Sequence, residues 1–76
     1  MDKTVWVLFS SAPISATDSR LRVELTALFE SFPSRDDINR VNIPAPTKEN
    51  LLKHHSWSVD TNGSVIFYDL EERVLN

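Results

Sequence analysis

The stretch of the chain that says most about its fold is residues 57–70, which read WSVDTNGSVIFYDL. The Asn62-Gly63 dipeptide is typical of a two-residue type I′ turn, because both central residues of that turn need positive φ angles. A loop of two residues fixes the register of the strands on either side of it, so a C-terminal hairpin is expected here. The expected cross-strand pairs are Trp57–Tyr68, Ser58–Phe67, Val59–Ile66, Asp60–Val65 and Thr61–Ser64.

A second strand is expected near the N-terminus, at residues 4–10. This segment is rich in β-branched and aromatic residues, and its apolar side chains would point to both faces of a strand. Strands that are apolar on both faces are typical of the centre of a sheet. We therefore expect residues 4–10 and 64–70 to be neighbouring central strands, and residues 11–14 to be a connector, because Pro13 would stop the strand.

Between residues 15 and 32 the apolar residues follow a helical spacing. They recur at i, i+4, i+7, i+8 and i+11, as Leu21, Leu25, Leu28, Phe29 and Phe32. Ser15 and Asp18 fit a loose capping-box spacing at the start, and Pro33 would end the helix. The pattern predicts a long helix over about residues 15–32.

The segment from residue 34 to residue 46 has two interpretations. Ser34 and Asp37 could cap a helical turn, which would bring Ile38 and Val41 together. The alternation of apolar residues before Pro44 and Pro46 instead favours a short edge strand near residues 40–43, and this strand is our expectation.

The rest of the chain adds one more helix and a tail. Thr47 is a suitable N-cap residue, and the apolar spacing after it predicts a short helix over about residues 48–55. Residues 71–76 are expected to form either a helical turn or a frayed end.

These segments predict an α+β fold, a two-layer sandwich with both helices packed on a three- or four-stranded, mainly antiparallel sheet. Seventy-six residues are expected to form a single domain over residues 1–76, because two halves would each be too small to close a core. The chain has no cysteine, which excludes disulfides, a thiol nucleophile and cysteine-based zinc sites. Neither a signal peptide nor a membrane span is recognisable in the sequence, so a cytoplasmic location is expected.

No pattern of residues points to catalysis. His54 and His55 are adjacent, so on a helix they would point about 100° apart and could not chelate one ion. The only glycine is in the expected turn, which leaves none for a phosphate-binding loop or a nucleophile elbow. The acidic pairs 36–37 and 71–72 are adjacent in sequence, whereas acid–base catalysis needs carboxylates that converge across a cleft. We therefore expect no enzymatic activity, no cofactor and no metal site.

Protein binding is the function that the sequence favours. The C-terminal hairpin carries aromatic residues of the kinds found at binding hot spots, although both tryptophans could instead fill the core. The hypothesis is a small, acidic, non-catalytic accessory protein that binds a larger protein or complex and modulates or inhibits it. The expected interface residues are Trp57, Phe67, Tyr68, Asp69, Glu71 and Glu72.

An alternative hypothesis is a nucleic-acid-binding regulator that uses residues 35–55. This segment is only weakly basic and the whole chain has a formal charge of −3, whereas phosphate binding normally needs a strong positive excess. The residues expected to bind in that case are Arg35, Arg40, Lys48, Lys53, His54 and His55. A homodimer formed through an open sheet edge is a third hypothesis, and no membrane partner is expected.

Overall fold

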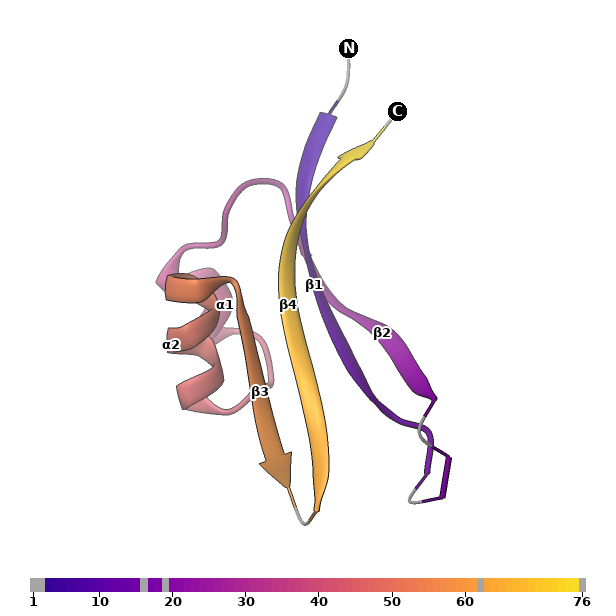
Figure 1. The fold of residues 1–76 in the computed structure, drawn as a ribbon. Helices are drawn as coiled ribbons and strands as arrows, with labels where there is room; N and C mark the ends of the chain where they lie inside the picture. Colours follow the sequence, from indigo (N-terminus) through magenta and orange to yellow (C-terminus); the bar gives the residue numbers. More distant parts are fainter. Residues whose placement is uncertain (1–2, 16, 19, 62, 76) are drawn as a thin grey trace.

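The computed structural model describes residues 3–15, 17–18, 20–61 and 63–75. The elements, in chain order, are β1 (Lys3–Pro13), β2 (Leu21–Phe29), α1 (Arg35–Asn39), α2 (Ala45–His54), β3 (Ser56–Thr61) and β4 (Ser64–Leu75). The strands form one open sheet in the order β2-β1-β4-β3, and all neighbours are antiparallel. A small α+β fold with a mainly antiparallel sheet is thus confirmed, and both of its helices are short (Figure 1).

The C-terminal hairpin has the predicted register. β3 and β4 pair from Ser56–Asp69 to Thr61–Ser64, and Trp57 lies opposite Tyr68. Gly63 has a φ of 82°, the left-handed conformation that a turn of this kind requires of its second residue. Asn62, the other half of the predicted turn, lies outside the described residues.

β1 and β4 form the centre of the sheet, as the sequence predicts. Their pairing runs from Lys3–Leu75 to Ser11–Phe67. β4 therefore continues as a strand through residues 71–75, and the prediction of a helical turn or a frayed end there is wrong. The prediction of a connector at residues 11–13 is also wrong, because β1 extends to Pro13 opposite Leu21.

The predicted long helix at residues 15–32 does not form. Residues 21–29 are strand β2, which pairs with β1 as an edge strand. Ser15 and Asp18 do make the local hydrogen bond of a helix cap, with the Asp18 N–H donating to Ser15 Oγ at 3.1 Å. Here that bond closes the β1–β2 loop, and the Asp18 carboxylate also accepts from the Arg20 guanidinium, which lowers the pKa of Asp18.

A β-bulge explains why β2 has the spacing of a helix. Leu25 lies opposite Phe9 and Ala27 lies opposite Leu8, so Thr26 is an extra residue in β2. The extra residue brings Leu28 onto the same face as Leu25, as in a helix, although the side chains of a regular strand repeat every second residue. The i, i+4, i+7 spacing of the apolar residues is therefore compatible with a bulged strand.

The segment before α2 is helical rather than extended. Ser34 caps α1 in a capping box with Asp37, and the fully buried Ile38 lies on this helix. The predicted strand near residues 40–43 is therefore wrong, and the capped helical turn is the interpretation that the structure has. The predicted short helix is present as α2, although it begins at Ala45 and buries Thr47 instead of using it as the cap.

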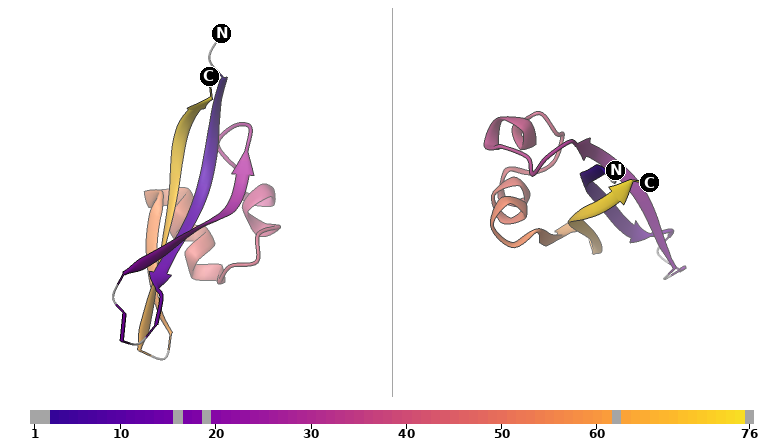
Figure 2. Two further views of the ribbon diagram at one scale, coloured as in Figure 1. Left: turned by 90° about the vertical axis from the view of Figure 1, so that its right-hand side faces the viewer. Right: turned by 90° about the horizontal axis from the view of Figure 1, so that it is seen from above.

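The helices pack on one face of the sheet, which we call the helix-covered face. Its core consists of Leu8, Ile38, Ile43, Leu51 and Leu70. Because side chains alternate along a strand, Trp6, Leu8 and Leu70 point to the helices, and their odd-numbered neighbours point to the other side, the uncovered face. Figure 2 shows both helices on one side of the twisted sheet.

Candidate functional site

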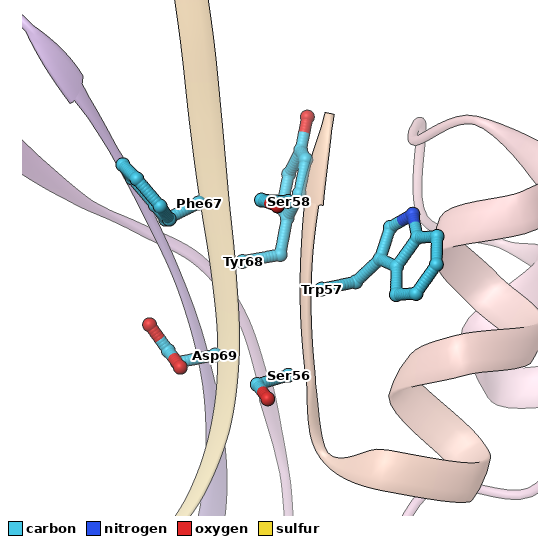
Figure 3. Close-up of a pocket in the computed structure, with 6 residues that line it drawn as sticks. All are labelled: Ser56, Trp57, Ser58, Phe67, Tyr68 and Asp69. Carbon is cyan, nitrogen blue, oxygen red and sulfur yellow. The ribbon is translucent and has the colours of Figure 1, made fainter. Parts of the chain in front are cut away.

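The structure divides the predicted interface residues between the two faces of the sheet. Register and alternation place Trp57, Tyr68 and Glu72 on the helix-covered face, and Phe67, Asp69 and Glu71 on the uncovered face. Figure 3 shows Trp57 directed toward α2, whereas Phe67 and Asp69 lie on the opposite side of the strand pair. The six residues therefore do not form one surface.

The two most exposed aromatic residues of the hairpin illustrate this division. Trp57 is 40% exposed and Phe67 is 42% exposed, so the two rings are equally accessible on opposite faces. Tyr68 is half-buried and packs against the core cluster, as does Trp6. Trp6 thus belongs to the core, whereas Trp57 remains largely at the surface.

The uncovered face carries the largest group of exposed apolar side chains in the described part of the chain. β2 contributes four residues that are each more than half exposed, namely Leu21 (52%), Val23 (61%), Leu25 (61%) and Leu28 (56%). By register, Phe9 of β1 and Phe67 of β4 lie on the same face. Isolated exposed apolar residues are ordinary, but a contiguous patch marks an interaction surface.

A shallow hollow of about 200 Å³ lies within this apolar face. Three strands line it, and all of its residues point to the uncovered face by register. The lining residues are Phe9, Ser11, Val23, Asp69, Glu71 and Arg73. The hollow thus combines apolar side chains from β1 and β2 with a row of charged side chains from β4.

Arg73 organises the charged side of the hollow. It lies opposite Val5 in the register, and its guanidinium lies over the Phe9 ring at 5.4 Å from the ring centroid. The same guanidinium forms an ion pair with Glu71. The arm of Arg73 therefore extends along the face past Val7, and Val5 and Val7 are buried although no helix covers them.

Of the two acidic side chains that line the hollow, Asp69 is the one available to bind a cationic ligand. It lies opposite Phe9 in the register and on the same face as the Glu71–Arg73 pair. Among the residues that the structure describes, no cationic group lies within ion-pair distance of Asp69. The hollow is therefore suited to a cationic group that enters beside an apolar one.

Most of the apolar part of this site was not among the residues predicted from the sequence. Phe9 was assigned to a central strand, and Leu25 and Leu28 to the apolar side of a helix, where they would be covered. The signal that could have found them is the alternation in residues 21–25, LRVEL, which is typical of a strand with one apolar face.

The cationic residues proposed for nucleic-acid binding are spread over the helical side of the molecule. The Arg35 guanidinium donates to Glu49, which raises the pKa of Arg35, and Lys48 Nζ donates to the Asn39 carbonyl at 3.1 Å. Arg40 caps the end of α1, and Lys53 and His54 lie in the last turn of α2. Two of these cations thus have partners within the protein, and nucleic-acid binding stays a prediction.

His55 has a structural position at the end of α2. Its ring packs against Trp6 at 5.5 Å and Phe32 at 5.2 Å between centroids. Its carbonyl accepts a hydrogen bond from the Leu70 N–H at 2.8 Å. Within the described ranges, no group of three or more histidine or acidic side chains is arranged to hold a metal ion.

Two further observations concern the chain as a whole. None of the helices in the described residues has the length and apolar character needed to cross a membrane. Comparison of the chain with protein-family models, with curated proteins and with solved structures finds no match.

Proposed function

We propose that this chain is a non-catalytic accessory protein that docks on a larger protein or complex, and modulates or inhibits it, through the uncovered face of its sheet. The observation that carries the proposal is the row of four apolar side chains on β2, each more than half exposed, beside Phe9 and Phe67. Desolvating such a row on binding is favourable by about 25 cal/mol for each Å² of apolar surface.

The charges of the hollow define the chemistry of the partner. Glu71 is paired with Arg73, which leaves the Asp69 carboxylate to receive a cation from outside. The partner surface that fits best is therefore an apolar projection with a lysine or arginine next to it. A charged rim of this kind sets specificity and association rate, whereas the apolar contacts supply most of the affinity.

The proposal is tested by affinity capture from the native host, with nuclease-treated extract and crosslinking, using a matched pair of variants. Phe67→Ala and Trp57→Ala remove equally exposed aromatic rings from opposite faces of the same hairpin. We expect Phe67→Ala to weaken capture of a stoichiometric partner at least about tenfold, as loss of a hot-spot aromatic does. Trp57→Ala should capture the partner normally, and Asp69→Lys should reduce capture by charge repulsion.

Circular dichroism and urea unfolding establish that each variant remains folded before it is compared. Capture that depends on Trp57 and not on Phe67 would move the interface to the helix-covered face. Capture that disappears with nuclease treatment would favour the nucleic-acid hypothesis instead.

A further inference from the structure

The outer edge of β2 is an open strand edge, and its regular part, residues 21–25, lies before the bulge at Thr26. β2 is the last strand of the sheet and has nine residues, with neither proline nor glycine among them. α2 packs against β3 and β4, and α1 packs against α2. The end of α1 and the residues after it lie beside the C-terminal part of β2, at Thr26, Ala27 and Phe29, which leaves residues 21–25 without a helix beside them. An exposed, apolar edge strand of this length is a template for pairing with another strand.

The hydrogen-bonding direction of this edge can be deduced from the β1–β2 loop. The Ile14 N–H donates to the Arg20 carbonyl at 3.0 Å, so this carbonyl points toward β1. In an antiparallel ladder this direction alternates from one residue to the next, and the register is regular from Leu21 to Leu25. The N–H and C=O groups of Leu21, Val23 and Leu25 therefore point outward, away from the sheet.

The charged residues of β2 are placed so that two antiparallel copies of this strand would bring opposite charges together. Arg22 and Glu24 lie on the helix-covered face and form an ion pair with an Nε–Oε1 distance of 3.0 Å. If two copies of β2 paired antiparallel with Val23 opposite Val23, each Arg22 would lie opposite the Glu24 of the other copy. Shifting that register by two residues would instead oppose Arg22 to Arg22 or Glu24 to Glu24, which is unfavourable.

The apolar side chains fit the same register. With Val23 on the twofold axis, Leu21 lies opposite Leu25 of the second copy, and all six apolar side chains lie on the uncovered face. The bulge at Thr26 limits the regular pairing to residues 21–25, since the strand changes direction there. We propose that β2 pairs with β2 of a second copy, with Val23 opposite Val23, to give a homodimer with a continuous eight-stranded sheet.

This dimer goes beyond the proposed function and does not depend on it. A twofold axis through Val23, perpendicular to the sheet, keeps both uncovered faces on the same side of the joined sheet. Each copy of the hollow lined by Phe9 and Asp69 then remains accessible. The edge can therefore pair with a second copy while the faces still accept a partner.

A charge-swap experiment tests the pairing with purified protein alone. Sedimentation of the wild-type chain over a range of concentrations is expected to show a monomer–dimer equilibrium. Arg22→Glu and Glu24→Arg should each raise the dimer dissociation constant about tenfold or more, because each introduces two like-charge pairs per dimer. Mixing these two variants should restore dimers of one copy each, since opposite charges then face one another across the axis.

The mixing step separates contacts between copies from the ion pair within one copy. Loss of the internal Arg22–Glu24 pair in one chain cannot be repaired by adding a different chain, so a structural defect would persist in the mixture. Dimers that form equally well in all variants, or a mixture that stays monomeric, would overturn the proposal.

The register itself is tested with single cysteines, which are unique because the natural chain has none. Val23→Cys should form an intermolecular disulfide on mild oxidation, because directly opposed residues have Cα atoms about 5.5 Å apart. Leu28→Cys is the matched control on the same strand and face, with similar exposure. In the proposed register the two copies of residue 28 are ten residues apart along the strands, about 33 Å.

Equal crosslinking of both cysteines would contradict the register, as would crosslinking of Leu28→Cys alone. A wild-type chain that remains monomeric at all accessible concentrations would contradict the dimer, but it would leave the capture experiment with Phe67→Ala unaffected. The two proposals therefore fail separately.

Discussion

Thr47 shows how a single side chain limits the stability of a small core. Its side chain is fully buried, and its hydroxyl has no hydrogen-bond partner among the residues that the structure describes. A buried hydroxyl without a partner destabilises the folded state, because it loses its hydrogen bonds to water and forms none within the protein. We expect Thr47→Val, which replaces the hydroxyl with a methyl group, to increase the free energy of unfolding by about 1 kcal/mol. Urea unfolding followed by tryptophan fluorescence measures this difference.

The control for this prediction is Thr47→Ser. It keeps the unpartnered hydroxyl but deletes the buried methyl group, so it should destabilise the protein by about 1 kcal/mol. A destabilised Thr47→Val variant would show that the hydroxyl makes a favourable interaction in solution.

His55 shows a residue that adopts an unfavourable backbone conformation because its side chain is needed there. Its φ of 67° is in the left-handed region, where glycine is the usual residue at the end of a helix. Glycine would relieve the backbone but would remove the ring that packs against Trp6 and Phe32. The choice of histidine therefore favours aromatic packing over local backbone energy.

At the scale of elements, α1 depends on its N-cap. The helix has five residues, too few to be stable alone, yet it positions the fully buried Ile38. The Asp37 N–H donates to Ser34 Oγ at 3.1 Å, and the Ser34 N–H donates to the Asp37 carboxylate at 3.2 Å. We expect Ser34→Ala to lower the free energy of unfolding by about 1 kcal/mol, measured by urea titration.

Two further variants make this prediction specific. Ser34→Asp supplies another cap acceptor and should remain close to the wild type. Ser31→Ala, at an exposed position just upstream, should change the free energy of unfolding by less than about 0.5 kcal/mol. An equal loss in Ser31→Ala and Ser34→Ala would show that the cap is not the cause.

The elements also show which parts of the structure could be predicted from the sequence. The β3–β4 register follows from one local signal, Asn62-Gly63, and the central position of β1 follows from its two apolar faces. β2 could not be assigned in the same way, because its bulge gives a strand the apolar spacing of a helix. Residues 21–29 form a strand because they pair with β1, and this tertiary contact overrides the local spacing that favours a helix.

The candidate site was predictable only where the hairpin was. Phe67 was found on the predicted hairpin, and Asp69 and Glu71 were named as acidic residues at and beyond its end, whereas Phe9 and Val23 were missed along with β2. A surface made from three strands becomes visible only when their register is known. Trp57 and Phe67 lie on opposite faces of the sheet because side chains alternate along paired strands. Which of these faces the helices cover becomes known only from the structure.

At the scale of the whole molecule, the core occupies only part of an elongated sheet. The principal dimensions are 44 × 27 × 18 Å. The helices lie beside the middle of the sheet, and β1, β3 and β4 all extend past them at the same end (Figure 1). The buried pair Leu8–Leu70 lies under the helices, whereas residues 21–25 lie at the edge of the projecting part. Such a shape should give regions of unequal stability within one chain.

Native-state hydrogen exchange at a concentration where the monomer predominates tests this expectation. The Leu70 N–H, which donates to the His55 carbonyl at 2.8 Å beside the core, should exchange only on global unfolding, with the free energy found by urea titration. The Val23 N–H, which points outward from the edge, should exchange with an opening free energy near zero. Uniform protection of both amides in the monomer would show that the edge is covered within one chain, whereas protection of Val23 that appears only at high concentration places the second copy along β2.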